Sequence, residues 1–186
     1  QFRTTKDKIK VVDSFGENDV YDLVFVVVRR EQLDALLPQI WENQGSQVFV
    51  MIGNNLTAKE TAKKIEEKSC TKKKILFGFQ ISGGRRERGR VVSIHTGFST
   101  DSGYLTFGSL DHDETSLALV KKAFSLTNFK LEVSPDMDAW LKCHAAIVLP
   151  ICFAVYYCQG DLKKAVWNRV LINQVIDSMA DALKIL

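Results

Sequence analysis

The sequence predicts an α/β protein, in which a doubly wound sheet lacking its first strands is followed by an all-helical domain. Apolar runs of strand length alternate with helix-like runs as far as Gly83 and Gly84. Short strand patterns with intervening turns follow that glycine pair, and almost everything after Ser134 has a helical pattern. We therefore expect two domains, residues 1–133 and residues 134–186.

The first part of the chain contains three strand patterns and two helix patterns. The run from Asp22 to Val28 is continuously β-branched and aromatic, which is typical of a strand buried on both faces. Thr57 and Glu60 have the spacing of a capping box at the start of a helix. The elements expected in order are a strand at 22–28, a helix from 33 to about 45, a strand at 48–52, a helix at 57–68 and a strand at 75–81.

The later elements are shorter strands and then helices. Ser134, Pro135 and Asp136 combine a capping serine, a first-turn proline and an acid near the positive end of the helix dipole, which predicts a helix start. We expect this helical region to break near residues 159–161. The other elements expected are short antiparallel strands at 91–96 and 104–107, a helix at 115–124 and an edge strand at 130–133.

The composition is that of an ordinary soluble globular protein, with 46% hydrophobic and 25% charged residues. A net charge of +3 does not favour a nucleic-acid partner. The arginines from Arg85 to Arg90 are interpreted as a solvated turn, because no aromatic residues interleave them. The apolar run from Ala145 to Cys158, at 14 residues, is too short to span a bilayer, so we expect a buried helix and no membrane partner.

Four cysteines form no CxxC pair and have no metal-ligand spacing with the three histidines, so no metal site is expected. Three of them lie in the apolar stretch, where a free cysteine behaves as a small buried hydrophobe. This usage fits a reducing cytoplasm. The polar residues 1–10 do not resemble a signal peptide.

Polar residues follow the first two predicted strands, at the position where open α/β sheets bind ligands. Arg29 to Gln32 come directly after the first strand, and Asn54 lies directly after the second. An arginine can hold phosphate or ribose oxygens, and an asparagine offers both a donor and an acceptor. The alternative is that the arginine is a surface charge and the asparagine part of a plain turn.

Lys142 lies near the start of the apolar helix, where partial burial would lower its pKa. Such a lysine suits ketone reduction, in which the carbonyl is polarised and the nascent alkoxide receives a proton. The alternative is a surface ion pair with Asp138, four residues earlier. We interpret His144 as a structural residue rather than a proton carrier.

Together these residues resemble the ketopantoate reductase family. The resemblance runs from about Val11 to Pro150. It rests on the strand and Gln32 of residues 21–33, on a turn at 52–56, on a hairpin at 84–97 and on a Trp-x-Lys motif at 140–142. It implies a partial Rossmann-type domain and a helical substrate domain, with NADPH and a 2-keto acid bound between them. A homodimer is a further expectation of the family.

The resemblance also implies roles for single residues. Arg29, Gln32, Asn54 and the backbone at Gly84 would bind the cofactor, Asn54 and Lys142 would bind the substrate, and Lys142 would be the catalytic proton donor. Arg29 stands where the family has lysine, which changes the shape and reach of the cation. Two positions where the family has substrate-binding asparagines hold Ala146 and Pro150.

The leading hypothesis is therefore an NADPH-dependent 2-keto acid reductase whose substrate need not be ketopantoate. The alternative is a non-catalytic member of the same superfamily that binds a nucleotide or a partner. The sequence has no G-x-G-x-x-G loop, and we expect a family member truncated at both ends. This chain alone should then bind NADPH poorly and turn over no substrate, because that loop and its helix hold the pyrophosphate.

Overall fold

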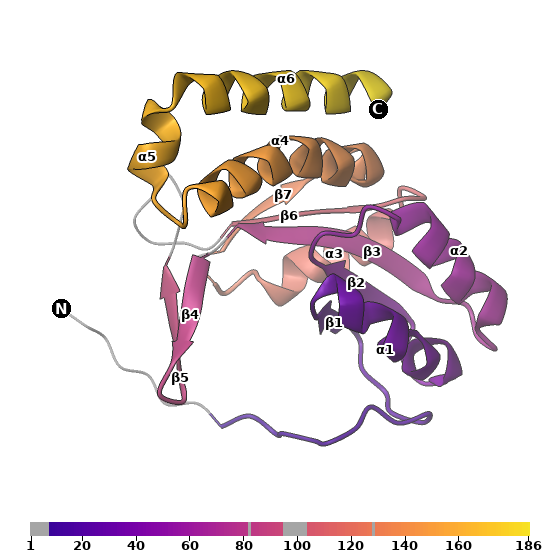
Figure 1. Ribbon diagram of the computed structural model, residues 1–186. Helices are drawn as coiled ribbons and strands as arrows, with labels where there is room; N and C mark the ends of the chain where they lie inside the picture. The colour runs from indigo at the N-terminus through magenta and orange to yellow at the C-terminus, as the bar shows by residue number, and fades with distance from the viewer. Residues whose placement is uncertain (1–7, 82, 95–103, 128) are drawn as a thin grey trace.

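A computed structural model describes residues 8–81, 83–94, 104–127 and 129–186 (Figure 1). Its main sheet has five strands in the order β1-β2-β3-β6-β7. The parallel strands are β1 (Val24–Val27), β2 (Val48–Ile52) and β3 (Lys74–Ile81), and β6 (Tyr104–Ser109) runs antiparallel to β3. The last strand, β7 (Lys130–Val133), is parallel to β6. The predicted α/β class and the antiparallel strand at 104–107 are confirmed.

Helices cover both faces of this sheet. On one face α1 (Arg30–Glu42), α2 (Ala58–Lys68) and the first half of α4 (Met137–Tyr157) enclose a core that includes Phe49 and Phe77. On the other face α3 (Glu114–Ala123) packs on Val50, Leu76 and Phe107. Adjacent residues of a strand point to opposite faces, so the neighbours Phe49 and Val50 belong to different cores. This double covering explains why β2 and β3 are almost continuously apolar. The expectation that the first strand is buried on both faces was wrong, because β1 lies at the edge of the sheet and its Val27 is 64% exposed.

A separate hairpin follows β3, made of β4 (Gly83–Glu87) and β5 (Arg90–Ile94). Its two-residue turn has positive φ angles at Arg88 (47°) and Gly89 (77°), as a tight right-twisting hairpin requires. The hairpin expected at 84–97 is therefore present over the described residues. The expected strand at 91–96 is described as far as Ile94, and its last two residues lie outside the described ranges.

The C-terminal helices form a layer outside the sheet. After α4 the chain breaks at Gln159 and Gly160, both with positive φ, as predicted. It continues through α5 (Leu162–Trp167) into α6 (Arg169–Ile185), which lies along α4 on the side away from the sheet (Figure 1).

The expectation of a buried apolar helix at 145–158 was wrong. Within this stretch Ala145, Ala154 and Cys158 are buried, whereas Phe153 and Tyr156 are largely exposed. Cys152 is exposed and Cys143 half-buried, so the expected burial of these cysteines holds only for Cys158. The helix also has 21 residues, which by length and composition alone is enough to cross a membrane.

Two helix starts differ from their predictions. The cap of α4 is Asp136, whose Oδ1 accepts a hydrogen bond from the Ala139 N–H at 2.9 Å. Ser134 still belongs to the strand region, since its N–H donates to the Phe107 carbonyl at 2.8 Å. At α2, the Thr57 hydroxyl makes no capping hydrogen bond, so the predicted capping box does not form.

Candidate functional site

The carboxyl ends of β1 and β2 form the floor of the candidate site. Because the two strands are parallel, the segments that follow them meet at one edge of the sheet, where α1 and α2 begin. A small cavity at this edge is lined by Arg30, Gly53, Asn54 and Asn55 over an apolar base that includes Met51. We call it the strand-end cavity. The positive ends of two helix dipoles face the same region as these polar side chains.

The two arginines after β1 lie differently. Arg29 is exposed and its Nε pairs with Glu31 Oε1 at 3.1 Å. Arg30 lines the cavity, pairs with Asp34 at 3.3 Å and donates from Nη2 to the Thr57 hydroxyl at 3.4 Å. The latter bond crosses from the first residue of α1 to the residue before α2. Sequence reasoning placed the cofactor contact on Arg29, but Arg30 is the arginine that lines the cavity.

Gln32 has a local structural role. Its Oε1 accepts a hydrogen bond from the Arg29 backbone N–H at 3.2 Å, which satisfies a group at the start of α1. The side chain is exposed, so the bond leaves it accessible to a ligand. The proposed contact between Gln32 and a cofactor remains a prediction.

The turn after β2 separates two adjacent asparagines. Gly53 has φ of 137°, and its N–H donates to the Gly78 carbonyl at 2.9 Å, which extends the β2–β3 ladder by one bond. Asn54 is exposed, whereas Asn55 is buried and donates weakly to the Met51 and Gly53 carbonyls at 3.5 and 3.4 Å. Asn54 is therefore the side chain of the pair that is accessible from solvent.

Lys142 is paired with a buried carboxylate. Its Nζ lies 2.8 Å from Asp138 Oδ2, and Lys59 Nζ at the start of α2 lies 3.1 Å from the same oxygen. The ion-pair alternative for Lys142 is thus realised. The hydrogen bond to Asp138 raises the pKa of Lys142, so the lowering expected from burial was wrong. Lys142 carries a proton at neutral pH, which is the form that a proton donor needs.

Trp140 and His144, which also belong to α4, pack against Phe79 of β3. The His144 ring is stacked on Trp140 at 5.1 Å between centroids, and its centroid lies 4.1 Å from that of Phe79. Burial lowers the pKa of His144, which keeps the ring neutral at neutral pH. These contacts match the structural interpretation of His144 and give Trp140 a packing role.

Polar contacts therefore connect the starts of three helices. Arg30 reaches Thr57 between α1 and α2, and Lys59 reaches Asp138 between α2 and α4. Sequence reasoning missed Lys59, because its partner is distant in the chain and no local pattern marks the pair. Gly84 makes none of these contacts and lies in the β4–β5 hairpin that follows β3.

The positions expected to hold substrate-binding asparagines continue along α4. Ala146 lies one helical turn after Lys142 and is half-buried. Pro150, another turn on, lines the groove between α4 and α6. Neither residue supplies a side-chain amide, and Pro150 lies on the face of α4 that borders α6.

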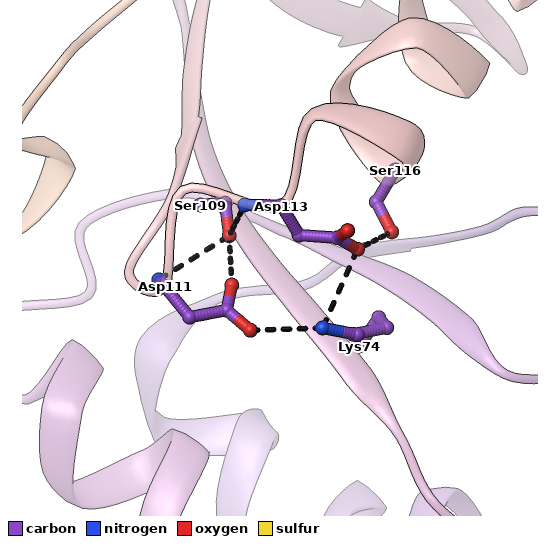
Figure 2. A network of polar contacts seen from close by, with 5 residues as sticks. All are labelled: Lys74, Ser109, Asp111, Asp113 and Ser116. Carbon is purple, nitrogen blue, oxygen red and sulfur yellow. Dashed lines mark hydrogen bonds and ion pairs between the residues drawn. The ribbon is translucent and has the colours of Figure 1, made fainter.

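A second polar cluster lies at the opposite end of β3 (Figure 2). Lys74 Nζ pairs with the carboxylates of Asp111 at 2.9 Å and Asp113 at 3.6 Å. The Ser109 hydroxyl accepts hydrogen bonds from the backbone N–H groups of the same two aspartates. Ser116 donates to the Asp113 carboxylate. The cluster joins the end of β6 to the start of α3. These bonds pair its groups with one another, and we assign it a structural role.

The sequence matches no protein-family model and no curated protein sequence. The fold is similar to that of a probable 2-dehydropantoate 2-reductase from Bacillus subtilis, with a TM-score of 0.64 and 15% identity over 91% of this chain and 55% of that one. It is also similar to D-mandelate dehydrogenase in complex with NADH, with a TM-score of 0.68 and 14% identity over 88% of this chain and 52% of that one.

A dimeric ketopantoate reductase from Staphylococcus aureus gives a TM-score of 0.62 with 10% identity, over 92% of this chain and 53% of that one. The chain thus spans about half the length of each of these solved structures. At such identities the likeness concerns the fold. The chain has the fold of the Rossmann-type sheet and adjoining helices of ketopantoate reductases.

Proposed function

We propose that this chain carries part of the active site of a nicotinamide-dependent 2-hydroxy acid dehydrogenase of the ketopantoate reductase family. In this proposal the enzyme of which the chain forms part reduces a 2-keto acid with NADPH in the cytoplasm. The observation that carries the proposal is the set of polar contacts that links the starts of α1, α2 and α4, in which Arg30 also lines the strand-end cavity. The fold shared with solved reductases supports it.

The residues present fit one part of the cofactor. Arg29, Gln32 and Asn54 are exposed at the carboxyl ends of β1 and β2 and offer donors to ribose and phosphate oxygens, and the Gly84 backbone would border the same ligand. The sequence holds no glycine-rich loop for the pyrophosphate. The cofactor would supply the hydride. We therefore expect NADPH to bind these 186 residues poorly, and micromolar binding would refute this expectation.

Lys142 is the proposed proton donor and, with Asn54, the proposed substrate contact. Its ammonium group would polarise the keto oxygen and pass it a proton as the alkoxide forms. Ala146 and Pro150 stand where the family places amides, so the proposal assigns a 2-keto acid substrate without specifying ketopantoate. A substrate lacking ketopantoate's hydroxyl would need fewer of those amides.

The test is NADPH oxidation with ketopantoate and a panel of other 2-keto acids, measured on the longest form of the protein that its gene encodes. Lys142→Ala should lower kcat by about 10²–10⁴-fold. Lys184→Ala is the matched control, because Lys184 is an exposed helix lysine that also pairs with an aspartate, at 3.0 Å. Equal activity of wild type and Lys142→Ala would remove Lys142 from the mechanism.

The second candidate function is a non-catalytic member of the superfamily that binds a nucleotide or a partner protein. Ala146 and Pro150 favour it, since the amides that would hold the substrate are replaced. NADPH binding without turnover of any acid in the panel would select this alternative.

A homodimer is part of the same proposal. Large apolar side chains are exposed along the second half of α4, in α5 and along α6, and they include Phe153, Tyr156, Trp167 and Val170. A surface of this kind usually marks an interface. A strictly monomeric sedimentation profile at micromolar concentrations would contradict the dimer.

A further inference from the structure

We propose that Asp138 is a positioning residue for the Lys142 ammonium group, and that Lys59 is a reserve cation that keeps this carboxylate paired when Lys142 turns to a ligand. The proposal rests on the proposed function of Lys142 as proton donor. It adds two residues to that function, one beside Lys142 on α4 and one from α2.

The geometry places two ammonium groups on one carboxylate oxygen. Lys142 Nζ and Lys59 Nζ lie 2.8 and 3.1 Å from Asp138 Oδ2. The Asp138 side chain is only 6% exposed, whereas Lys142 is 36% and Lys59 66% exposed. The carboxylate is therefore the fixed member of the group, and both lysines retain access to solvent.

Asp138 is held as a charged group by its place in the fold. It lies in the first turn of α4, where the helix dipole favours a negative charge. Burial alone would raise its pKa, but hydrogen bonds from Lys142 and Lys59 outweigh burial and lower it. Its second oxygen, Oδ1, is buried and has no hydrogen-bond partner among the described residues. Because one oxygen of this buried carboxylate has no such partner, the stability of its charged form depends strongly on the cations at the other oxygen.

This dependence explains why a second lysine matters. If Lys142 were the sole cation, its departure toward a keto acid would leave a buried, unpaired carboxylate, which is highly unfavourable. With Lys59 in place, the carboxylate keeps one partner while Lys142 moves. Besides Lys59, which shares the carboxylate, two further charges act on Lys142, namely Glu60 on α2 and Asp136 before α4. Both are acidic and act with Asp138 to favour its protonated form.

The first experiment titrates Lys142 by NMR in the 186-residue chain with isotope-labelled lysine. Asp138→Asn should lower the titration midpoint of Lys142, because the hydrogen bond and the charge of Asp138 that raise its pKa are both weakened or removed. Asp181→Asn is the matched control. It removes the partner of Lys184 in an exposed pair and should leave Lys142 unchanged. An unchanged Lys142 midpoint in Asp138→Asn would overturn the positioning role.

The second experiment uses thermal unfolding of Lys59→Met, Lys142→Met and the double variant. Each single variant leaves one cation on Asp138, so its Tm should fall only slightly. The double variant should fall by about 6 °C or more beyond the sum of the single changes, because a buried carboxylate then loses both partners. Adding Asp138→Asn to the double variant should recover most of this loss. Additive changes in Tm would overturn the reserve role of Lys59.

Neither experiment uses a cofactor or a keto acid, so the two proposals fail separately. A protein without reductase activity can still show both effects, in which case the proposed function falls and the geometry of the three residues stands. Reductase activity with a flat titration and additive unfolding would retain the function and reject the roles of Asp138 and Lys59.

Discussion

The two halves of α4 differ in composition and in surroundings, because the first half includes Asp138, Lys142 and His144 whereas residues 148–157 include no charged side chain. Met137 and Leu141 in the first half are completely covered by the sheet and by α1 and α2. In the second half Phe153 and Tyr156 project into solvent, because α6 covers the helix from one side only. Apolar composition therefore does not predict which half of α4 is buried. Burial depends on whether the sheet or only α6 lies against that half of the helix.

The largest expected effect separates the sheet core from this outer layer. Phe77 in β3 is 0% exposed, and Phe77→Ala should lower the free energy of unfolding by about 3–5 kcal/mol, measured by urea denaturation. Phe153→Ala removes the same atoms from a side chain that is 69% exposed, and should change stability by less than about 0.5 kcal/mol.

A large loss of unfolding free energy in Phe153→Ala would contradict the contrast between a buried Phe77 and an exposed Phe153. It would mean that Phe153 is buried in solution, as it would be in the dimer proposed above. Repeating the denaturation over a range of protein concentrations distinguishes the cases, because the stability of a dimer depends on concentration and that of a monomer does not.

Several strands and helices could be predicted, because the order of apolar and polar residues along the chain determines which local structure buries the apolar ones. β2 has the predicted bounds of residues 48–52, since its apolar run fits a strand covered on both faces. β4 could not be predicted from residue preference, because Gly83–Glu87 has little strand preference and is ordered by pairing with β5. The hairpin at 84–97 was expected from the family resemblance alone. The start of α4 was misplaced for a similar reason, as the hydrogen bond from the Ser134 N–H to the Phe107 carbonyl of β6 continues the strand pairing one residue past β7.

The candidate site divides in the same way. Arg29 and Asn54 were found from a rule about strand ends, which needs only the order of the elements. The contacts of Arg30 with Thr57 and of Lys59 with Asp138 depend on how neighbouring helices pack, and no spacing in the chain encodes them. The pair of Asp138 with Lys142 was anticipated from its spacing of four residues, but the burial of Asp138, which makes this pair raise the pKa of Lys142, was not.

A smaller effect is expected at the polar cluster of Figure 2. Ser109→Ala should cost about 1–2 kcal/mol at pH 7, because the buried hydroxyl serves two backbone N–H groups and the Asp111 carboxylate. The hydrogen bond from Ser109, followed by that from Lys74, lowers the pKa of Asp111. The stabilisation linked to Asp111 is therefore present above its unfolded pKa of about 3.9 and lost as the pH falls through the lower folded value.

The cost of Ser109→Ala should accordingly shrink between pH 7 and pH 2–3, as measured by urea denaturation at each pH. Thr106→Val is the matched control on the same strand. Its hydroxyl is buried and has no hydrogen-bond partner among the described residues, so its loss should be neutral or stabilising at either pH. A pH-independent cost for Ser109→Ala would show that Asp111 plays no part.

The smallest effect tests whether the outer helical layer opens separately from the sheet. Asn168 caps α6, with Oδ1 accepting from the Leu171 N–H at 3.1 Å. Asn168→Ala should weaken the helix by about 1 kcal/mol, which corresponds to roughly fivefold faster amide exchange in α6. Asn168→Asp keeps the acceptor and should retain the wild-type rate. Exchange in β2 and β3 should not change, because α6 contacts α4 and α5 and not the sheet core. Equal acceleration in β2, β3 and α6 would mean that both layers unfold as one cooperative unit, and that the exposed half of α4 transmits stability to the covered half.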